Sequence, residues 1–134
     1  MSLTLAIIKP DAVGARNTGN ILALLEEQGF VIRAARMVRL TTAQAEAFYA
    51  VHKDRPFFRP LVTFMTSGPC LPLALERDNA VPYLREVIGA TDPAQAAPGT
   101  VRKRFAVSKE RNAIHASDSP ENATQEVKFF FPEL

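Results

Sequence analysis

The chain has 134 residues, a length typical of one domain, and it contains 47% apolar and 22% charged residues. This composition predicts one globular domain over residues 1–134 and argues against a disordered chain. The formal net charge of +2 gives no strong electrostatic reason to expect nucleic acid or an anionic membrane as the main partner.

Several features of the sequence indicate the cellular compartment of the protein. Residues 1–11 contain no basic leader, and their apolar run is too short for a signal peptide. No apolar stretch reaches the length that spans a membrane. Cys70 is the only cysteine, so an intrachain disulfide is impossible and a reducing environment is expected. These features predict a cytoplasmic protein without a membrane partner.

Apolar runs and turn residues predict strands alternating with helices through the first half of the chain. The first strand ends at Lys9, and Thr41-Thr42-Ala43-Gln44 is a capping-box pattern that opens a helix. Pro56 ends that helical stretch because a proline disfavours helical geometry in the residue before it. The expected elements are a strand over 3–8, a helix over 17–28, a strand over 31–40, a helix over 41–51 and helical structure over 61–65.

The second half predicts one long loop between further strands and helices. Pro72 lies inside an apolar run and limits strand pairing on one side. Residues 90–111 have weak periodicity, two prolines and many basic residues, which favours a functional or disordered loop. The expected elements are a strand over 70–75, a helix from Asp78 or Asn79 to Gly89, a short strand beside His115, and a helix from Pro120 to about Val127. This order suits an antiparallel sheet with helices on one face.

Several polar and aromatic residues are candidates for function, each with a structural alternative. Lys9 at a strand end is either a phosphate ligand or a solvated lysine, and Phe57 is either a stacking platform for a base or a core residue. The basic loop is either a polyphosphate clamp or a solvated surface, since arginine forks match phosphate oxygens. His115, one of two histidines, is a base, a nucleophile, a metal ligand or a structural residue at a strand edge.

Four segments together resemble the nucleoside diphosphate kinase family. The segment starting at Asn112 is similar to the active-site pattern N-x-hydrophobic-H-G-S-D-S of that family. The others are Ile7-Ile8-Lys9-Pro10-Asp11, residues 49–58 and residues 89–102, in the same order and with similar spacing. The resemblance extends from Leu5 to Phe131. It implies a ferredoxin-like βαββαβ sheet, an added helical hairpin around residues 42–66 and a long nucleotide-binding loop.

The resemblance also implies an activity. A γ-phosphoryl group would pass from a nucleoside triphosphate, mainly ATP, to a nucleoside diphosphate by a ping-pong phosphohistidine mechanism. Base specificity would be broad, because stacking is available to every base. Mg²⁺ would arrive with the nucleotide and bridge its phosphates, with no direct protein ligand. The chain would form a homo-oligomer, with a tetramer favoured over a hexamer because no long extension follows Phe131.

Roles follow residue by residue from the same resemblance. His115 would be phosphorylated on Nδ1, with Glu126 on its other ring nitrogen and Ser117 supporting either of them. Lys9 and Tyr49 would stabilise the transferred phosphoryl group, and Asp118 would contact the metal through water. The nucleotide-binding residues would be Arg85, Thr91 and Arg102 on the phosphates, Asn112 and Lys9 on the ribose, and Phe57 on the base. As alternatives, Glu126 is a surface carboxylate, Tyr49 packs at a helix end, and Ser117 and Asp118 shape a turn.

The sequence departs from the family pattern at a few positions. Ala116 stands where the family usually has glycine, and alanine would be strained there if the residue needed a positive φ. Arg104 stands where an acidic residue is common. Two rival functions remain: a regulatory module that binds nucleotide with poor turnover, suggested by Ala116, and a nucleic-acid binder, suggested by the basic loop and Phe57. His52 is interpreted as a charge partner at a helix end, not a catalytic residue.

Overall fold

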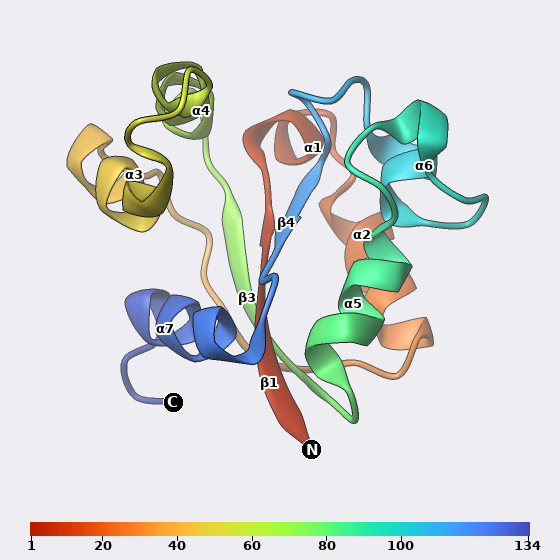
Figure 1. Cartoon of the computed structure of the whole chain (residues 1–134). Helices are drawn as coiled ribbons and strands as arrows, with labels where there is room; N and C mark the ends of the chain where they lie inside the picture. The colour runs from red at the N-terminus through yellow and green to blue at the C-terminus, as the bar shows by residue number, and fades with distance from the viewer.

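A computed structural model describes the whole chain, Met1–Leu134. Four strands form one antiparallel sheet in the order β2-β3-β1-β4 (Figure 1). The strands are β1 (Ser2–Ile8), β2 (Val31–Ala35), β3 (Leu71–Arg77) and β4 (Ile114–Ala116). This arrangement confirms the predicted antiparallel, ferredoxin-like sheet.

Seven α-helices and two short 3₁₀ helices connect and cover the strands. The α-helices are α1 (Pro10–Gly14), α2 (Thr18–Glu27), α3 (Thr42–Phe48), α4 (Phe58–Met65), α5 (Ala80–Ile88), α6 (Val101–Phe105) and α7 (Pro120–Phe130). The 3₁₀ helices are η1 (Ala50–His52) and η2 (Pro93–Gln95). None of the helices combines the length and the apolar character that crossing a membrane requires.

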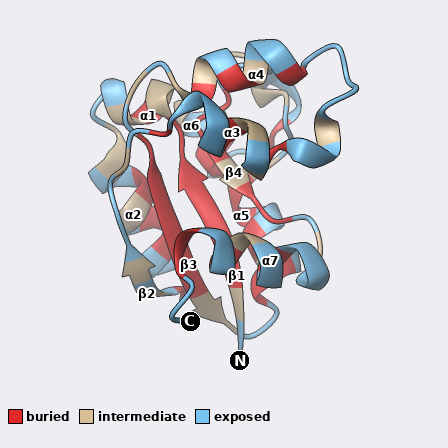
Figure 2. Cartoon of the chain, turned by 90° about the vertical axis from the view of Figure 1, so that its left-hand side faces the viewer, coloured by how far each residue is buried: buried red, intermediate tan, exposed pale blue.

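Strand β1 is buried on both faces, which explains its unbroken apolar sequence (Figure 2). Ala6 and Ile8 belong to one core, which α2 and α5 complete, and Leu5 and Ile7 belong to the other, with residues from α3, α4 and α7. Helices therefore cover both faces. The expectation of helices on one face holds for α2 and α5 of the βαββαβ unit, whereas the added hairpin and α7 cover the opposite face.

One boundary differs from the sequence prediction on the β2 side of the sheet. The strand expected to reach residue 40 ends at Ala35, and Val38 makes only an isolated bridge to Cys70. Pro72 explains this end, because its carbonyl accepts a bond from the Arg36 backbone N–H but it has no N–H to offer in return. A register shift between Ile32 and Ala34 also weakens the ladder.

The segment 90–111, predicted as a loop, contains η2 and α6. The Thr100 side chain caps α6 by accepting from the Lys103 backbone N–H at 3.3 Å. A Cβ at Gly89, where φ is +87°, would lie 2.6 Å from Thr100 Oγ1, so only glycine allows α5 to end against this cap. The five residues of α6 are too few for periodicity to reveal them.

Candidate active site

His115 is the central residue of β4, which pairs only with β1. Because side chains alternate along a strand, the imidazole lies on one face while Ile114 and Ala116 pack into the core on the other. The side chain of His115 is 20% exposed, so one part of the ring is open to solvent and the rest is enclosed.

Helix α7 brings a carboxylate to the imidazole. The helix is capped by Ser119, whose hydroxyl accepts from the Asn122 backbone N–H at 3.1 Å. Seven residues after that cap, Glu126 Oε1 lies 2.8 Å from His115 Nε2 and also accepts a 2.8 Å bond from Ser117 Oγ. The other ring nitrogen, Nδ1, has no hydrogen-bond partner. The carboxylate therefore selects the tautomer with the proton on Nε2 and leaves a lone pair on Nδ1.

The environment of His115 favours its neutral form. Burial lowers the pKa of the imidazole, and the positive charges of Lys9 and Arg102 lower it further. The hydrogen bond and the charge of Glu126 act in the opposite direction, but burial dominates. A neutral imidazole with a free Nδ1 lone pair is the form that can act as a nucleophile near neutral pH.

Two aromatic side chains from the end of α3 enclose the imidazole. Phe48 contacts it edge to face with ring centroids 5.4 Å apart, and Tyr49 does so at 6.2 Å. The Tyr49 hydroxyl is buried without a hydrogen-bond partner. Burial raises the pKa of Tyr49, so this hydroxyl stays protonated and can donate to a ligand.

Lys9 ends β1 and precedes α1, which begins at Pro10 and was not predicted from the sequence. Its Nζ donates to Asn112 Oδ1 at 2.9 Å, and the residue is 7% exposed. Burial lowers the pKa of Lys9 to about 8, with a further decrease from Arg102 and an opposing increase from Asp11. Lys9 is therefore positively charged at neutral pH, and burial has brought its pKa close to neutral pH.

Arg102 from α6 and Arg85 from α5 close the outer edge of β4. Arg102 donates to the carbonyls of Asn112 at 3.3 Å, Ile114 at 2.8 Å and Gly89 at 3.0 Å, and Arg85 donates to the Ala116 carbonyl at 3.5 Å. Burial and the nearby Arg85 charge lower the pKa of Arg102 to about 10. The Arg102 guanidinium therefore remains charged at neutral pH.

A pocket of about 540 Å³ opens between α5 and the segment that leads into α6. Three residues predicted to bind phosphates, Arg85, Thr91 and Arg102, line it together. Its size and its two arginines suit a polyanionic ligand. The structure therefore brings these three residues to one place from positions 85 to 102 of the chain.

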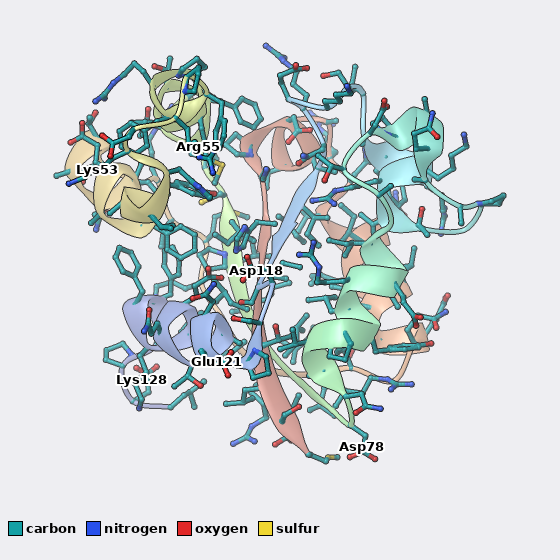
Figure 3. All side chains as sticks on the ribbon, in the orientation of Figure 1. Lys53, Arg55, Asp78, Asp118, Glu121 and Lys128 are labelled. Carbon is teal, nitrogen blue, oxygen red and sulfur yellow. The ribbon has the colours of Figure 1, made fainter.

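Four predicted site residues are exposed: Arg85 and Thr91 line the pocket, whereas Phe57 and Asp118 lie outside it. Phe57 is 48% exposed and packs against His52 with ring centroids 5.2 Å apart, and it makes no recorded contact with His115. Asp118 is exposed beside β4, on the segment that leads into α7, and it accepts a 2.6 Å bond from Asn122 Nδ2 (Figure 3). Both are accessible to a ligand, and neither belongs to the hydrogen-bonded cluster around the imidazole.

The donor set of the site suits anions better than a bare metal ion. No group of three or more histidine, cysteine, aspartate or glutamate side chains could hold a cation. The buried charges are those of Lys9 and Arg102, and the exposed Arg85 lies beside them at the edge of β4; all three are complementary to phosphates. A divalent cation would therefore need ligands from a bound anion, because the chain offers no carboxylate cluster to hold it.

Sequence reasoning missed two residues of the site and one strained position. Asp11 accepts a 3.0 Å bond from the Ala113 backbone N–H, and Phe48 packs against the imidazole. Ala113 has a positive φ of +73°, whereas Ala116 has none, so the condition under which alanine would be strained at 116 is not met. Ala116 is therefore not strained, and its methyl group packs in the core on the face of β4 opposite the imidazole. Only the Lys-Pro-Asp motif signalled Asp11, and nothing in the sequence singled out Phe48.

Comparisons with known proteins show the family of the chain. A profile of the family described as nucleoside diphosphate kinase matches residues 2–134. A nucleoside diphosphate kinase of Halorhodospira halophila is 58% identical over 128 residues, which are 96% of this chain and 91% of the relative. One of Desulfatibacillum aliphaticivorans is 52% identical over 133 residues, which are 99% and 96% of the two chains.

Solved structures show the same fold. The nucleoside diphosphate kinase of Aquifex aeolicus superposes with a TM-score of 0.95 at 47% identity, covering 97% of this chain and 94% of that one. The enzyme of Encephalitozoon cuniculi, solved without ligand, superposes with a TM-score of 0.94 at 36% identity, covering 98% and 89%.

Proposed function

Since the chain belongs to the nucleoside diphosphate kinase family and is an enzyme of that class, we propose that it phosphorylates nucleoside diphosphates through a phosphohistidine at His115. The donor is a nucleoside triphosphate, mainly ATP. One observation carries the proposal: Glu126 binds Nε2 of the imidazole and leaves Nδ1 without a partner. This arrangement matches the orienting role of the carboxylate in other histidine-dependent active sites.

In the first step, the Nδ1 lone pair of His115 forms a bond to the γ-phosphorus. The bond from this phosphorus to the β–γ bridging oxygen breaks, and the nucleoside diphosphate leaves with that electron pair. The Nε2 proton stays hydrogen-bonded to Glu126, whose charge stabilises the positive charge that develops on the ring. Ser117 holds this carboxylate in place through its 2.8 Å bond.

In the second step, an oxygen of the terminal phosphate of an acceptor diphosphate forms a bond to the same phosphorus. The phosphorus–nitrogen bond breaks, and its electron pair returns to Nδ1 of His115. One pocket serves donor and acceptor in turn, which defines a ping-pong sequence. Base specificity is broad, because the proposed contact to the base is stacking on the exposed Phe57 ring.

Cations and hydroxyls distribute the charge of the phosphates. Lys9 and the unpartnered Tyr49 hydroxyl act on the transferred phosphoryl group, and Arg85, Thr91 and Arg102 hold the remaining phosphates. Asn112 and Lys9, which are hydrogen-bonded to each other, reach the ribose hydroxyls. Mg²⁺, when bound with the nucleotide, neutralises charge on the phosphate oxygens.

We further propose that the enzyme acts in the cytoplasm as a homo-oligomer, with a tetramer favoured. The free and buried thiol of Cys70 suits a reducing compartment. The outer edge of β2 pairs with no strand of its own chain, and Val31 on it is 48% exposed. An open edge of this kind favours pairing with another chain, and a second copy is the simplest partner.

A labelling experiment tests the mechanism. Brief incubation with γ-labelled ATP and Mg²⁺ should give a protein-bound label that is labile in acid, stable in alkali, and released by a nucleoside diphosphate. The His115→Ala variant should give no label. The His52→Ala variant is a matched control and should label like the wild type, because His52 contacts only Phe57 among the rings.

The same experiment separates the rival functions. Nucleotide binding without any label would contradict the phosphohistidine mechanism and favour a regulatory module. Ala116, which suggested that module, has no positive φ, so alanine causes no backbone strain there. A nucleic-acid role would require DNA affinity that falls steeply with salt, and indifference to DNA at moderate salt would exclude it.

A further inference from the structure

Ala113, two residues before the nucleophile, has a backbone conformation that alanine rarely adopts. Its φ is +73°, and the Ile114 N–H donates to the Asn112 carbonyl at 2.9 Å across it. This combination is a tight γ-turn with positive φ, which is rare and strained. Strained turns persist only where surrounding contacts enforce them, and they gather at functional sites.

The Lys9–Asp11 segment enforces this turn from both sides. Asp11 Oδ2 accepts from the Ala113 N–H at 3.0 Å, and the Lys9 backbone N–H donates to the Ala113 carbonyl at 2.9 Å. Both polar groups of the strained residue are thus bound to one short segment. The other carboxylate oxygen, Asp11 Oδ1, is buried without a hydrogen-bond partner. Burying an unpaired oxygen is unfavourable, and a residue that only had to accept one backbone hydrogen bond would not require it.

The turn fixes the positions of the residues on either side of it. Asn112, before the turn, receives the Lys9 Nζ bond at 2.9 Å, and His115 follows after one more residue. Asp11 also acts on Lys9 by charge, since it raises the pKa that burial and Arg102 lower to about 8. The charges that act on the pKa of Lys9 are Arg102 from α6 and Asp11 from α1, and Lys9 in turn lowers the pKa of His115 on β4.

We propose that Asp11 is a positioning residue for phosphoryl transfer. Its carboxylate holds the turn at Ala113 closed, which fixes Asn112 and His115 relative to Lys9, and its charge keeps Lys9 protonated. This inference rests on the proposed phosphohistidine mechanism. It assigns Asp11 no contact with the nucleotide.

Two substitutions at Asp11 separate the hydrogen bond from the charge. In Asp11→Ala both are lost, and the single-turnover rate of His115 phosphorylation should fall roughly 10²-fold, as expected when a reacting group shifts by about 1 Å. In Asp11→Asn the side-chain amide oxygen can still accept the hydrogen bond from the Ala113 N–H. At mildly acid pH Lys9 is protonated even without the negative charge, so the phosphorylation rate should recover there. The alkaline limb of this variant's pH–rate profile should move to lower pH, because Lys9 has lost a nearby negative charge.

A second variant shows whether the turn itself is the cause. Glycine adopts positive φ without strain, so Ala113→Gly should recover part of the rate when added to Asp11→Ala. The matched control is Asp78→Ala, whose side chain is 84% exposed near the chain's N-terminus, at the opposite end of the sheet from α1 (Figure 3). It should label at the wild-type rate.

The outcomes are distinguishable. Failure of the wild type to form any label overturns the proposed function itself. A labelling wild type with an equally fast Asp11→Ala variant overturns the positioning role. A pH–rate profile of Asp11→Asn that matches the wild type overturns the charge effect on Lys9. If Ala113→Gly gives no recovery in a double variant that unfolds at the wild-type temperature, the turn is not the route of the effect.

Discussion

The two edges of the sheet differ in how their backbone groups are satisfied. At one edge, the carbonyls of β4 that point away from β1 accept hydrogen bonds from Arg102 and Arg85. At the other edge, β2 pairs with β3 alone and its outer side meets no other element of the sheet. Side chains therefore cover the short strand, and the longer strand is left open.

The two edges of the sheet therefore suit different functions. The arginines that cover β4 also line the phosphate pocket, so the same groups hold the histidine strand and face the proposed ligand. Because these arginines occupy the outward carbonyls of β4, no further strand can pair with it, and the arginines can contact a ligand. The open edge has no catalytic side chain and is available for a second copy of the chain. Substitutions at each edge should therefore have effects of different kinds.

The largest effect is expected from Arg102→Ala on the covered edge. It leaves the carbonyls of Gly89 and Ile114 without a donor and removes one of the two donors of the Asn112 carbonyl, so it should reduce the free energy of unfolding by about 3 kcal/mol. Urea denaturation measures this change. The affinity for nucleotide should also fall, because a pocket arginine is lost.

Lys103→Ala is the matched control for this substitution. Lys103 is the next residue on α6, is exposed, and donates no side-chain hydrogen bond. If both variants lost stability equally, the arginine would not be holding the edge of β4.

The next effect concerns the pH dependence of the covered edge. The pKa of Lys9 is lowered to about 8, so the lysine is charged below that pH and loses its proton as the pH rises through it. Because the charge is needed to hold the phosphoryl group, the rate of His115 phosphorylation should fall by about tenfold for each unit above pH 8. A stopped-flow pH profile measures this limb.

Lys9→Arg identifies the group responsible. An arginine stays protonated, so the alkaline limb should move to higher pH even if the maximum rate is lower. Lys53→Arg, on an exposed lysine of the added hairpin, should leave the profile unchanged (Figure 3). A limb that stays near pH 8 in Lys9→Arg would assign the titration to another group.

A smaller effect is expected on the open edge, where it should change assembly and leave the phosphorylation chemistry intact. Val31→Lys places a charge on β2, and lysine at a strand edge opposes pairing with another chain. Light scattering should show a smaller assembly, with His115 still labelled. Val107→Lys is the control, since Val107 is 77% exposed outside the sheet. An unchanged mass in Val31→Lys would place the subunit contact elsewhere.

Most of the strands and helices could be predicted from the sequence, because the sequence signals for them are local. The apolar run of β1, the capping box at Thr41 and the Ser119-Pro120 helix start each act within a few residues, and the structure contains the corresponding elements. The five-residue α6 escaped prediction because it is shorter than two helical turns.

The site was predictable only where a motif carried it. The segment with His115 and the residues of the phosphate pocket came from the resemblance, whereas the turn at Ala113 depends on Asp11, 102 residues earlier in the chain. Contacts of that range leave no periodic or local trace in a single sequence. The same reason explains why nothing in the sequence indicated the positive φ at Ala113.

The smallest effect is expected from Ala116→Gly, which restores the residue usual in the family. Because Ala116 has no positive φ, glycine relieves no strain there. Loss of a buried methyl group and greater freedom of the unfolded chain should instead destabilise the protein by about 1 kcal/mol. The labelling rate of His115 should not change, since the methyl group lies on the other face of β4. A faster rate in Ala116→Gly would mean that alanine restricts the approach of the nucleotide to the covered edge, and the regulatory alternative would regain its support.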